Sequence, residues 1–275
     1  MSELEPRHLK DFYKYERIGD LDKGKQSKKG TTVVRYHANI HSALELAVAD
    51  GLVGRNVAHK QRPNTVKYVG SFFTPDEAIE CLKAAEGTRL ELAVFFGLLY
   101  GLRREEIVGL KWQNFDFQSN TFSIMHTVTA FWHKGKSVQN AKDKAKNQSS
   151  MRTLPIIPLF RDKLMALKLK QKEDMRVFGN SYNKRYHGYV YIDEIGELVK
   201  PDYISTAFPK LLKKNDLRRI RFHDTRHSCA SLMLWHGVSM KEIQQYLVHS
   251  DYGTTANIYA HLDMEESMLT CVWRN

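Results

Sequence analysis

The sequence contains few cysteines and no long apolar run, and both absences exclude classes of protein. Its three cysteines, Cys81, Cys229 and Cys271, are far apart and form no CxxC pair, so we expect neither a disulfide framework nor a zinc ribbon. The longest strongly apolar run, residues 90–102, is too short to cross a bilayer. Residues 1–14 are charged and lack the apolar stretch of a signal peptide. We therefore expect a cytoplasmic protein with no membrane partner.

Basic residues outnumber acidic residues in this chain of 275 residues. Lys and Arg number 42 and Asp and Glu 31, which gives a formal net charge of +11. Hydrophobic residues make up 42%, which is enough for a folded core and too many for a disordered chain. Excess positive charge favours a polyanionic partner, most often nucleic acid, but many basic proteins bind none. Charge alone leaves both possibilities open.

The chain divides into a short first part and a longer second part. A helix with one apolar face is expected from Thr31 to a glycine stop at Gly51. The polar stretch 55–70 contains a proline and has the composition of a linker. We therefore expect a helical domain over residues 1–68 and a second domain over residues 69–275.

Helix signals dominate the second part. Thr74 and Glu77 have the spacing of a capping box, and so do Ser239 and Glu242. Further helices are expected at residues 88–100, 103–110, 159–174 and 254–262. Strands are expected at residues 115–129 with a turn at 119–120, at residues 153–157, and in a hairpin of residues 189–192 and 197–199. Residues 134–150 are polar and basic and are expected to form a long connection. The patterns predict a mainly α fold with a small antiparallel β-sheet, an α+β protein.

One segment, residues 221–228, concentrates groups that bind anions or metals. On a helix, His223, Arg226 and His227 share one face because they are three and four residues apart. The paired histidines are similar to the zinc-binding His-Glu-x-x-His pattern, but Arg226 puts a permanent cation beside the metal. Alternatively, arginine and histidine together bind an oxyanion such as phosphate. A partly buried polar helix is the third interpretation, and the segment alone does not decide.

Further segments carry groups of the same kind. Arg103 follows Gly101 at the expected start of a helix, where anions are favoured. His249 comes after the capped helix, and Tyr259 follows ten residues later. The ordered set Gly-Leu-Arg, His-x-x-Arg-His, His-Ser and Tyr resembles the tyrosine recombinases, or phage-type integrases. The resemblance covers about residues 31–262 and is nearest to the integrases of conjugative transposons.

The resemblance implies a catalytic role for six residues. They are Arg103, Lys146, His223, Arg226, His249 and Tyr259. Tyr259 is then the nucleophile, Lys146 the general acid for the departing 5′-oxygen, and His223 an acid or base for Tyr259. The arginines and histidines stabilise charge on the attacked phosphodiester in place of a divalent metal, so no metal ligand or cofactor is implied. Glu106 matches the glutamate that accompanies the first arginine.

The assignments leave some ambiguity. Lys146 opens the segment Lys-Asn-Gln-Ser-Ser-Met-Arg-Thr, which is similar to the family's hairpin-lysine segment, but Lys144 and Lys142 are close. Val248 stands where the family usually has glycine before the histidine. Arg104 beside Arg103 permits a shift of one residue, although the Gly-Leu-Arg spacing favours Arg103.

The resemblance implies a site-specific DNA recombinase that integrates and excises a mobile element. Family members cleave DNA through a 3′-phosphotyrosyl intermediate and a Holliday junction, as tetramers and without metal or ATP. Residues 1–68 then form a core-type DNA-binding domain and residues 69–275 the catalytic domain, in a bacterial, nucleoid-associated protein. The alternatives are a metal-dependent nuclease or hydrolase that uses His223 and His227, and a DNA-binding module that has lost catalysis.

The resemblance also implies contacts with double-stranded DNA and with other protomers. Candidates for phosphate contacts are Lys23, Lys25, Lys28, Lys29 and Arg35, each equally well explained as solvated surface. The tail, residues 263–275, keeps apolar groups such as Met268 and Trp273, and we expect it to dock on an adjacent protomer. Packing on its own domain is the alternative. The first domain shows no clear full first helix, so we expect a chain shortened at its N-terminus, without an arm-type DNA-binding domain.

Overall fold

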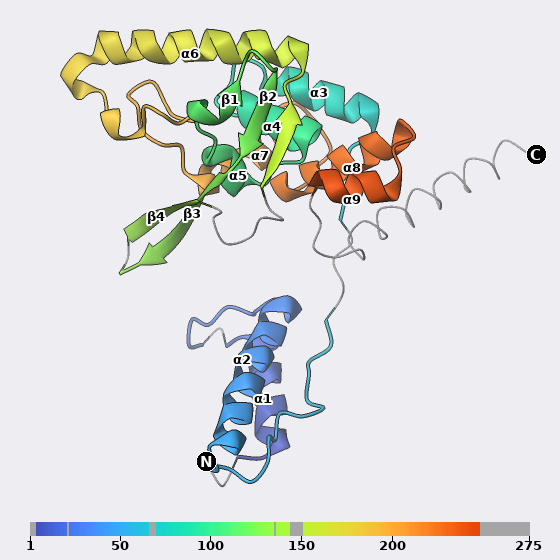
Figure 1. Ribbon diagram of the computed structural model, residues 1–275. Coiled ribbons are helices and arrows are strands. Elements are labelled where there is room, and N and C mark those ends of the chain that lie inside the picture. Colours follow the sequence, from blue (N-terminus) through green and yellow to red (C-terminus); the bar gives the residue numbers. More distant parts are fainter. Residues whose placement is uncertain (1–3, 21, 66–69, 135, 144–150, 248–275) are drawn as a thin grey trace, which may run out of the picture. The chain divides into compact units, whose positions relative to one another are not determined.

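The computed structural model describes residues 4–20, 22–65, 70–134, 136–143 and 151–247 (Figure 1). The chain forms two compact units, residues 1–69 and 70–275. Within the described ranges, no helix has both the length and the apolar character needed to cross a membrane.

The first unit contains a helix pair, α1 (Pro6–Ile18) and α2 (Gly30–Ala49). Leu9 and Tyr13 of α1 are buried and lie in one hydrophobic cluster with residues of α2. The expectation of an incomplete first helix is wrong, because α1 is a regular helix of 13 residues. Its apolar pattern is weak, because only Leu9 and Tyr13 are buried hydrophobic residues and the third buried side chain of α1 is that of Glu16. Burial of so few residues against α2 is a tertiary effect that periodicity within the segment does not show.

The second unit is mainly helical and holds two small antiparallel sheets. Its α-helices in the described range are α3 (Pro75–Ala85), α4 (Glu91–Tyr100), α5 (Arg104–Val108), α6 (Pro158–Phe178), α7 (Pro201–Lys214), α8 (Thr225–Trp235) and α9 (Met240–Leu247). Short 3₁₀ turns lie at η1 (Trp112–Asn114), η3 (Gly179–Ser181), η4 (Lys184–Tyr186) and η5 (Phe222–Asp224). One large hydrophobic core joins α3, α4, α6 and α7 to the three-stranded sheet. Most residues of α4 are buried in this core. The predicted α+β fold is confirmed.

Both capping boxes form as the sequence predicts. The Thr74 hydroxyl accepts from the Glu77 backbone at 3.3 Å, and the Glu77 carboxylate accepts from the Thr74 backbone at 2.8 Å. At the start of α9, the Glu242 carboxylate accepts from both the backbone and the hydroxyl of Ser239, at 3.0 and 2.6 Å. Local side-chain to backbone pairing therefore fixes where α3 and α9 begin.

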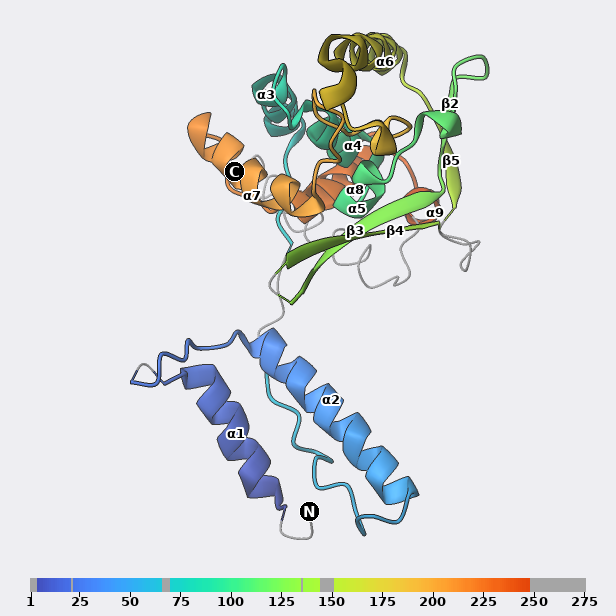
Figure 2. The ribbon, with the colours of Figure 1, turned by 90° about the vertical axis from the view of Figure 1, so that its left-hand side faces the viewer.

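The sheets are built from short strands. The three-stranded sheet has the order β1 (Phe115–Asp116), β2 (Thr121–Ile124) and β5 (Arg152–Pro155), all antiparallel. A separate hairpin pairs β3 (His126–His133) with β4 (Lys136–Asp143). The hairpin contacts α5 and α7 near its base and extends beyond the helices of this unit (Figures 1 and 2).

Two expectations about the strands are corrected. The segment 134–150 is not only a connection, because β4 occupies its first half; the chain beyond it, residues 144–150, lies outside the described residues. Its polar residues do not alternate with apolar ones, so backbone pairing with β3 makes it a strand. The segments 189–192 and 197–199 do turn back on each other, with one antiparallel bridge from Ile192 to Leu198, but they are too short to form regular strands. The backbone of Tyr189 pairs with Lys111 instead.

Candidate active site

The Gly-Leu-Arg motif forms the turn between α4 and α5. Gly101 ends α4 with φ of 60°, in the left-handed region, and a Cβ atom there would lie 2.4 Å from Leu247 Cδ2. Leu102 is 1% exposed and anchors the turn in the core. Arg103 then caps α5 with an extended backbone, and its side chain is 38% exposed. Gly101 therefore permits the turn, Leu102 holds the turn in the core, and Arg103 stays accessible to solvent at the start of α5.

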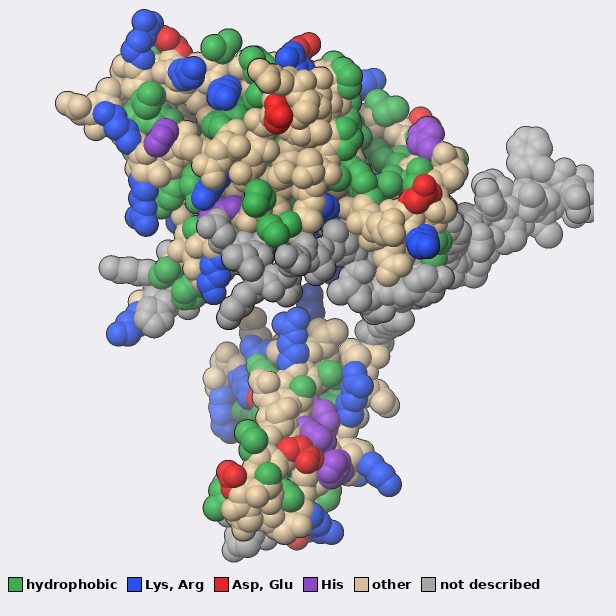
Figure 3. Space-filling view, viewed as in Figure 1, with side chains coloured by type: hydrophobic (Ala, Val, Ile, Leu, Met, Phe, Trp, Pro, Cys, Tyr) green, Lys and Arg blue, Asp and Glu red, His purple; other side chains and the backbone are tan. Residues whose placement is uncertain are grey.

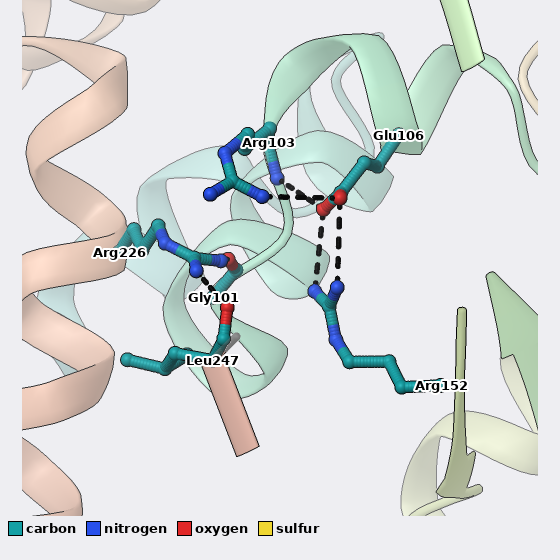
Figure 4. Close-up of polar contacts among 6 residues, drawn as sticks. All are labelled: Gly101, Arg103, Glu106, Arg152, Arg226 and Leu247. Atoms are coloured by element: carbon teal, nitrogen blue, oxygen red, sulfur yellow. Dashed lines mark hydrogen bonds and ion pairs between the residues drawn. The ribbon is translucent and has the colours of Figure 1, made fainter. Parts of the chain in front are cut away.

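Arg226 lies in the first turn of α8 and is only 2% exposed. Its two terminal nitrogens donate to the carbonyl oxygens of Gly101 and Leu247 (Figure 4). Burial and the nearby Arg103 charge lower the pKa of Arg226 to about 9, so the side chain stays charged at neutral pH. The fork of the guanidinium thus ties α8 to the α4–α5 turn and to the end of α9.

Glu106 of α5 is the acidic partner in this cluster and is 2% exposed. Its carboxylate accepts from the Arg103 backbone at 3.0 Å and from Arg103 Nη1 at 3.3 Å. Arg152 of β5 donates to the same carboxylate through Nη2 at 3.2 Å and Nη1 at 3.5 Å (Figure 4). Two guanidinium groups therefore bond one carboxylate, and the Arg226 charge is close enough to interact with it electrostatically. The excess of positive charge suits an anion.

Arg152 is the residue of this cluster that the sequence analysis missed. It lies in the segment that is similar to the family's hairpin-lysine segment, in which only Lys146 is predicted to be catalytic. Its side chain is 8% exposed, and its Nε atom has no hydrogen-bond partner within the described residues. One signal in the sequence could have identified Arg152: it directly precedes the strand expected from Thr153. A charged residue so close to the core needs a partner of opposite charge.

His223 lies in η5, directly before α8, and is exposed. Desolvation of its ring and the Arg226 charge lower its pKa, with a further contribution from Arg103. Its ring and the His227 ring are edge to face, with centroids 5.9 Å apart. His223 is therefore a mostly neutral imidazole in the field of the two motif arginines, which suits proton transfer.

His227, the second histidine of the predicted metal pair, packs its ring against Gly70. A Cβ atom at Gly70 would lie 3.1 Å from His227 Cδ2. Its Nδ1 atom is buried and has no hydrogen-bond partner among the described residues. Within the same part of the chain, no third His, Cys, Asp or Glu lies close enough to complete a metal site with His223 and His227. The geometry does not favour the interpretation as a metal hydrolase.

The remaining predicted catalytic residues, Lys146, His249 and Tyr259, lie outside the described residues, as does the tail 263–275. Lys144 does too, whereas Lys142 is described, as an exposed residue of β4. The structure therefore brings together Arg103, Glu106 and Arg226 from segments far apart in the chain, with His223 in their field.

The predicted phosphate contacts lie on the first unit. Lys28, Lys29 and Arg35 are exposed at or near the start of α2. Lys23 pairs with Asp20 at 3.3 Å. Lys25 pairs with Glu16 and lies 4.0 Å from the centre of the Tyr15 ring. Lys23 and Lys25 are thus paired with carboxylates of the first unit, whereas Lys28, Lys29 and Arg35 are exposed.

Comparisons with known proteins identify the family of this chain. The sequence matches the Phage integrase family over residues 71–266. It is 27% identical over 255 residues to a tyrosine recombinase XerC-like protein of Caldanaerobacter subterraneus, covering 86% of this chain and 64% of the relative. It is 25% identical over 261 residues to the ICEBs1 integrase of Bacillus subtilis, covering 93% of this chain and 66% of the relative. The chain thus spans just under two thirds of the length of these relatives.

Solved structures share the fold. The Tn1549 transposon integrase in complex with circular intermediate DNA aligns with a TM-score of 0.71 at 16% identity, over 98% of this chain and 85% of that one. A lambda integrase dimer bound to a core site aligns with a TM-score of 0.59 at 17% identity, over 94% of this chain and 80% of that one. The chain belongs to the phage integrase family, the tyrosine recombinases.

Proposed function

We propose that the protein is a site-specific DNA recombinase that integrates and excises a mobile element. The observation that carries the proposal is the meeting of Arg103 and Arg226, from two motifs more than a hundred residues apart in the chain, around the α4–α5 turn. Two guanidinium groups on one side of a turn, with His223 beside them, provide the donors that a pentavalent phosphoryl transition state requires.

In the proposed reaction, the Tyr259 hydroxyl attacks a backbone phosphate of DNA. The bond from phosphorus to the 5′-oxygen breaks, and the protein becomes linked to the 3′-phosphate. Lys146 protonates the departing 5′-oxygen, while Arg103, Arg226 and His249 bind the phosphate oxygens. His223 takes the proton from Tyr259. The phosphotyrosyl bond conserves the energy of the broken bond, so rejoining to another 5′-hydroxyl needs neither ATP nor metal.

DNA binding is proposed for both parts of the chain. The first unit acts as the core-type DNA-binding domain of residues 1–68, with Lys23, Lys25, Lys28, Lys29 and Arg35 on phosphates. The second unit acts as the catalytic domain. The Tn1549 and lambda integrase structures contain DNA, and one lambda integrase structure is a tetramer on a Holliday junction. We extend both properties to this chain, as a nucleoid-associated tetramer whose C-terminal tails are exchanged between protomers.

The decisive experiment uses nicked DNA from the ends of the encoding element, incubated with the protein in EDTA. The nick lets the short fragment that carries the new 5′-hydroxyl diffuse away, so rejoining is prevented and the covalent adduct is trapped. The expected result is an adduct that persists without divalent metal, is lost in Tyr259→Phe and is retained in Tyr252→Phe, a nearby tyrosine outside the motif. Cutting that EDTA abolishes, without an adduct, would overturn the proposal in favour of a metal nuclease. Binding without cutting would leave only a DNA-binding module.

Tail exchange has a separate test. Deletion of residues 264–275 is expected to weaken both oligomerisation on DNA and strand cleavage. Unchanged oligomerisation and cleavage in the deletion variant would contradict the exchange and leave the recombinase proposal intact.

A further inference from the structure

The first unit holds a cluster of metal-ligating side chains that the recombinase chemistry does not use. His41 and Glu45 lie one turn apart on α2, and His59 lies in the segment that follows this helix. One ligand atom from each of the three lies within 4.8 Å of the other two. Histidine and acidic side chains lie side by side on the visible face of this unit (Figure 3). No comparable group occurs elsewhere within the described residues.

The distances in the cluster are close to those of a metal site. His41 Nε2 lies 3.4 Å from His59 Nδ1, and 3.8 Å from Glu45 Oε1. Two ligands bound tetrahedrally to zinc at about 2.0–2.1 Å are themselves about 3.3 Å apart. The pair of imidazole nitrogens therefore already has the separation of two zinc ligands. Glu45 Oε1 is also 3.0 Å from His59 Nε2, so both ring nitrogens of His59 lie close to another ligand atom of the cluster.

A buried amide holds the ligands in place. Asn56 is 6% exposed, and its Nδ2 donates to Glu45 Oε1 at 2.6 Å and to the His41 carbonyl at 3.0 Å. Its Oδ1 accepts from the Ala58 backbone at 2.9 Å, which fixes the chain just before His59. Hydrogen bonds of this kind orient ligands in protein metal sites. The hydrogen bonds of Asn56 therefore hold the ligand residues close together without a bound metal.

The three ligand side chains are accessible to an ion from solution. The side chains of His41, Glu45 and His59 are 33%, 47% and 63% exposed. Two imidazoles and one carboxylate favour zinc over magnesium or calcium, which prefer oxygen ligands alone.

We propose that the first unit binds one Zn²⁺ ion through His41, Glu45 and His59, with water as the fourth ligand. The ion joins α2 to the segment at residues 56–59 and stabilises the unit. The ion takes no part in the chemistry proposed for Tyr259, which needs no metal. The two proposals can fail separately, because Zn²⁺ binding is lost with His59 or Glu45 and the covalent adduct is lost with Tyr259.

The test is calorimetric titration of the EDTA-treated, dialysed full chain with Zn²⁺ alone. The expected result is one site that is at least tenfold weaker in His59→Ala and in Glu45→Gln, and unchanged in His236→Ala, an exposed histidine of the second unit. His59 is largely exposed, so its replacement is expected to leave the far-ultraviolet circular dichroism unchanged. Zn²⁺ should also raise the midpoint of thermal unfolding in the unaltered chain and not in His59→Ala.

Two results would overturn the proposal. The first is an absence of Zn²⁺ binding to the unaltered chain, which would make the cluster a hydrogen-bonded group only. The second is binding that His59→Ala and Glu45→Gln leave unchanged, which would place the ion elsewhere. Asn56→Ala offers a graded check, because it removes the orienting amide and retains all three ligands; weaker binding is expected, and unchanged binding would contradict the role given to Asn56.

Discussion

Arg152 and Glu106 form a two-point ion pair in which neither side chain is more than 8% exposed. The pair links β5 to the first turn of α5. It also holds the carboxylate that Arg103 uses, so the position of an accessible arginine depends on a buried one. The chain segment that leads into Arg152 contains Lys146. The pair therefore anchors one end of the segment that carries the proposed general acid.

Removal of one partner of this pair is expected to destabilise the second unit. Glu106→Gln leaves the Arg152 charge buried without its carboxylate, and the free energy of unfolding should fall by about 3 kcal/mol. All four tryptophans lie beyond residue 111, so urea denaturation followed by tryptophan fluorescence reports on this unit. The double variant Glu106→Gln/Arg152→Met buries no unpaired charge at either position. It should unfold at a higher urea concentration than Glu106→Gln alone, and simple addition of the two single effects would contradict the coupling.

The variant Arg226→Lys retains the positive charge at this position and removes the two-nitrogen geometry of the guanidinium group. A lysine ammonium cannot reach the carbonyls of Gly101 and Leu247 while presenting two donors to a phosphate. Strand cleavage in single turnover should fall about 100-fold or more, with DNA affinity changed little. The matched control is Arg104→Lys, because Arg104 is paired with Glu105 at 2.8 Å outside the cluster. Arg104→Lys is expected to cleave normally, and normal cleavage in Arg226→Lys as well would show that position 226 requires only a positive charge.

Local signals in the sequence were sufficient for much of the fold. The Thr74 and Ser239 capping boxes and the glycine stop at Gly51 depend on neighbours within four residues, and each forms as predicted. The meeting of Arg103 with Arg226 followed from the family resemblance, not from any local pattern. The structure adds the backbone carbonyls that fix Arg226.

Features that depend on a partner outside their own segment were missed. The helix α1 is stabilised by a few contacts with α2, and β4 is a strand because β3 pairs with it along its whole length. Arg152 becomes informative only when Glu106 is placed beside it. In each case the deciding partner lies in another element, either the neighbouring one or a distant one, so the segment itself carries too weak a signal.

Gly101→Ala is expected to damage both stability and the cluster. The left-handed backbone costs alanine roughly 1–2 kcal/mol, and the added Cβ atom meets Leu247 Cδ2 at 2.4 Å. Displacement of Leu247 moves the carbonyl that Arg226 uses, so cleavage should also slow. Gly87→Ala is the control, since Gly87 has φ of 68° with nothing within 4 Å of an added Cβ atom. Tryptophan-monitored urea unfolding should show a larger loss for Gly101→Ala by about 1–3 kcal/mol. Equal losses would mean that backbone conformation alone accounts for the glycine.

The stability of the second unit should fall as pH drops below the ordinary histidine pKa. Burial lowers the pKa of His227 in the folded chain, and the charges of His223, Arg221 and Arg226 add to the effect while Asp224 opposes it. The unfolded chain therefore binds more protons than the folded chain below about pH 6.5, and stability is lost from there down to the folded pKa. The urea midpoint should be lower at about pH 5.5 than at about pH 7.5. Glu77 adds nothing in this window, because its lowered pKa places its contribution below the ordinary glutamate pKa. His227→Gln should reduce the difference between the two midpoints and His236→Gln should not, whereas an unaltered difference in His227→Gln would show that the pH dependence arises elsewhere.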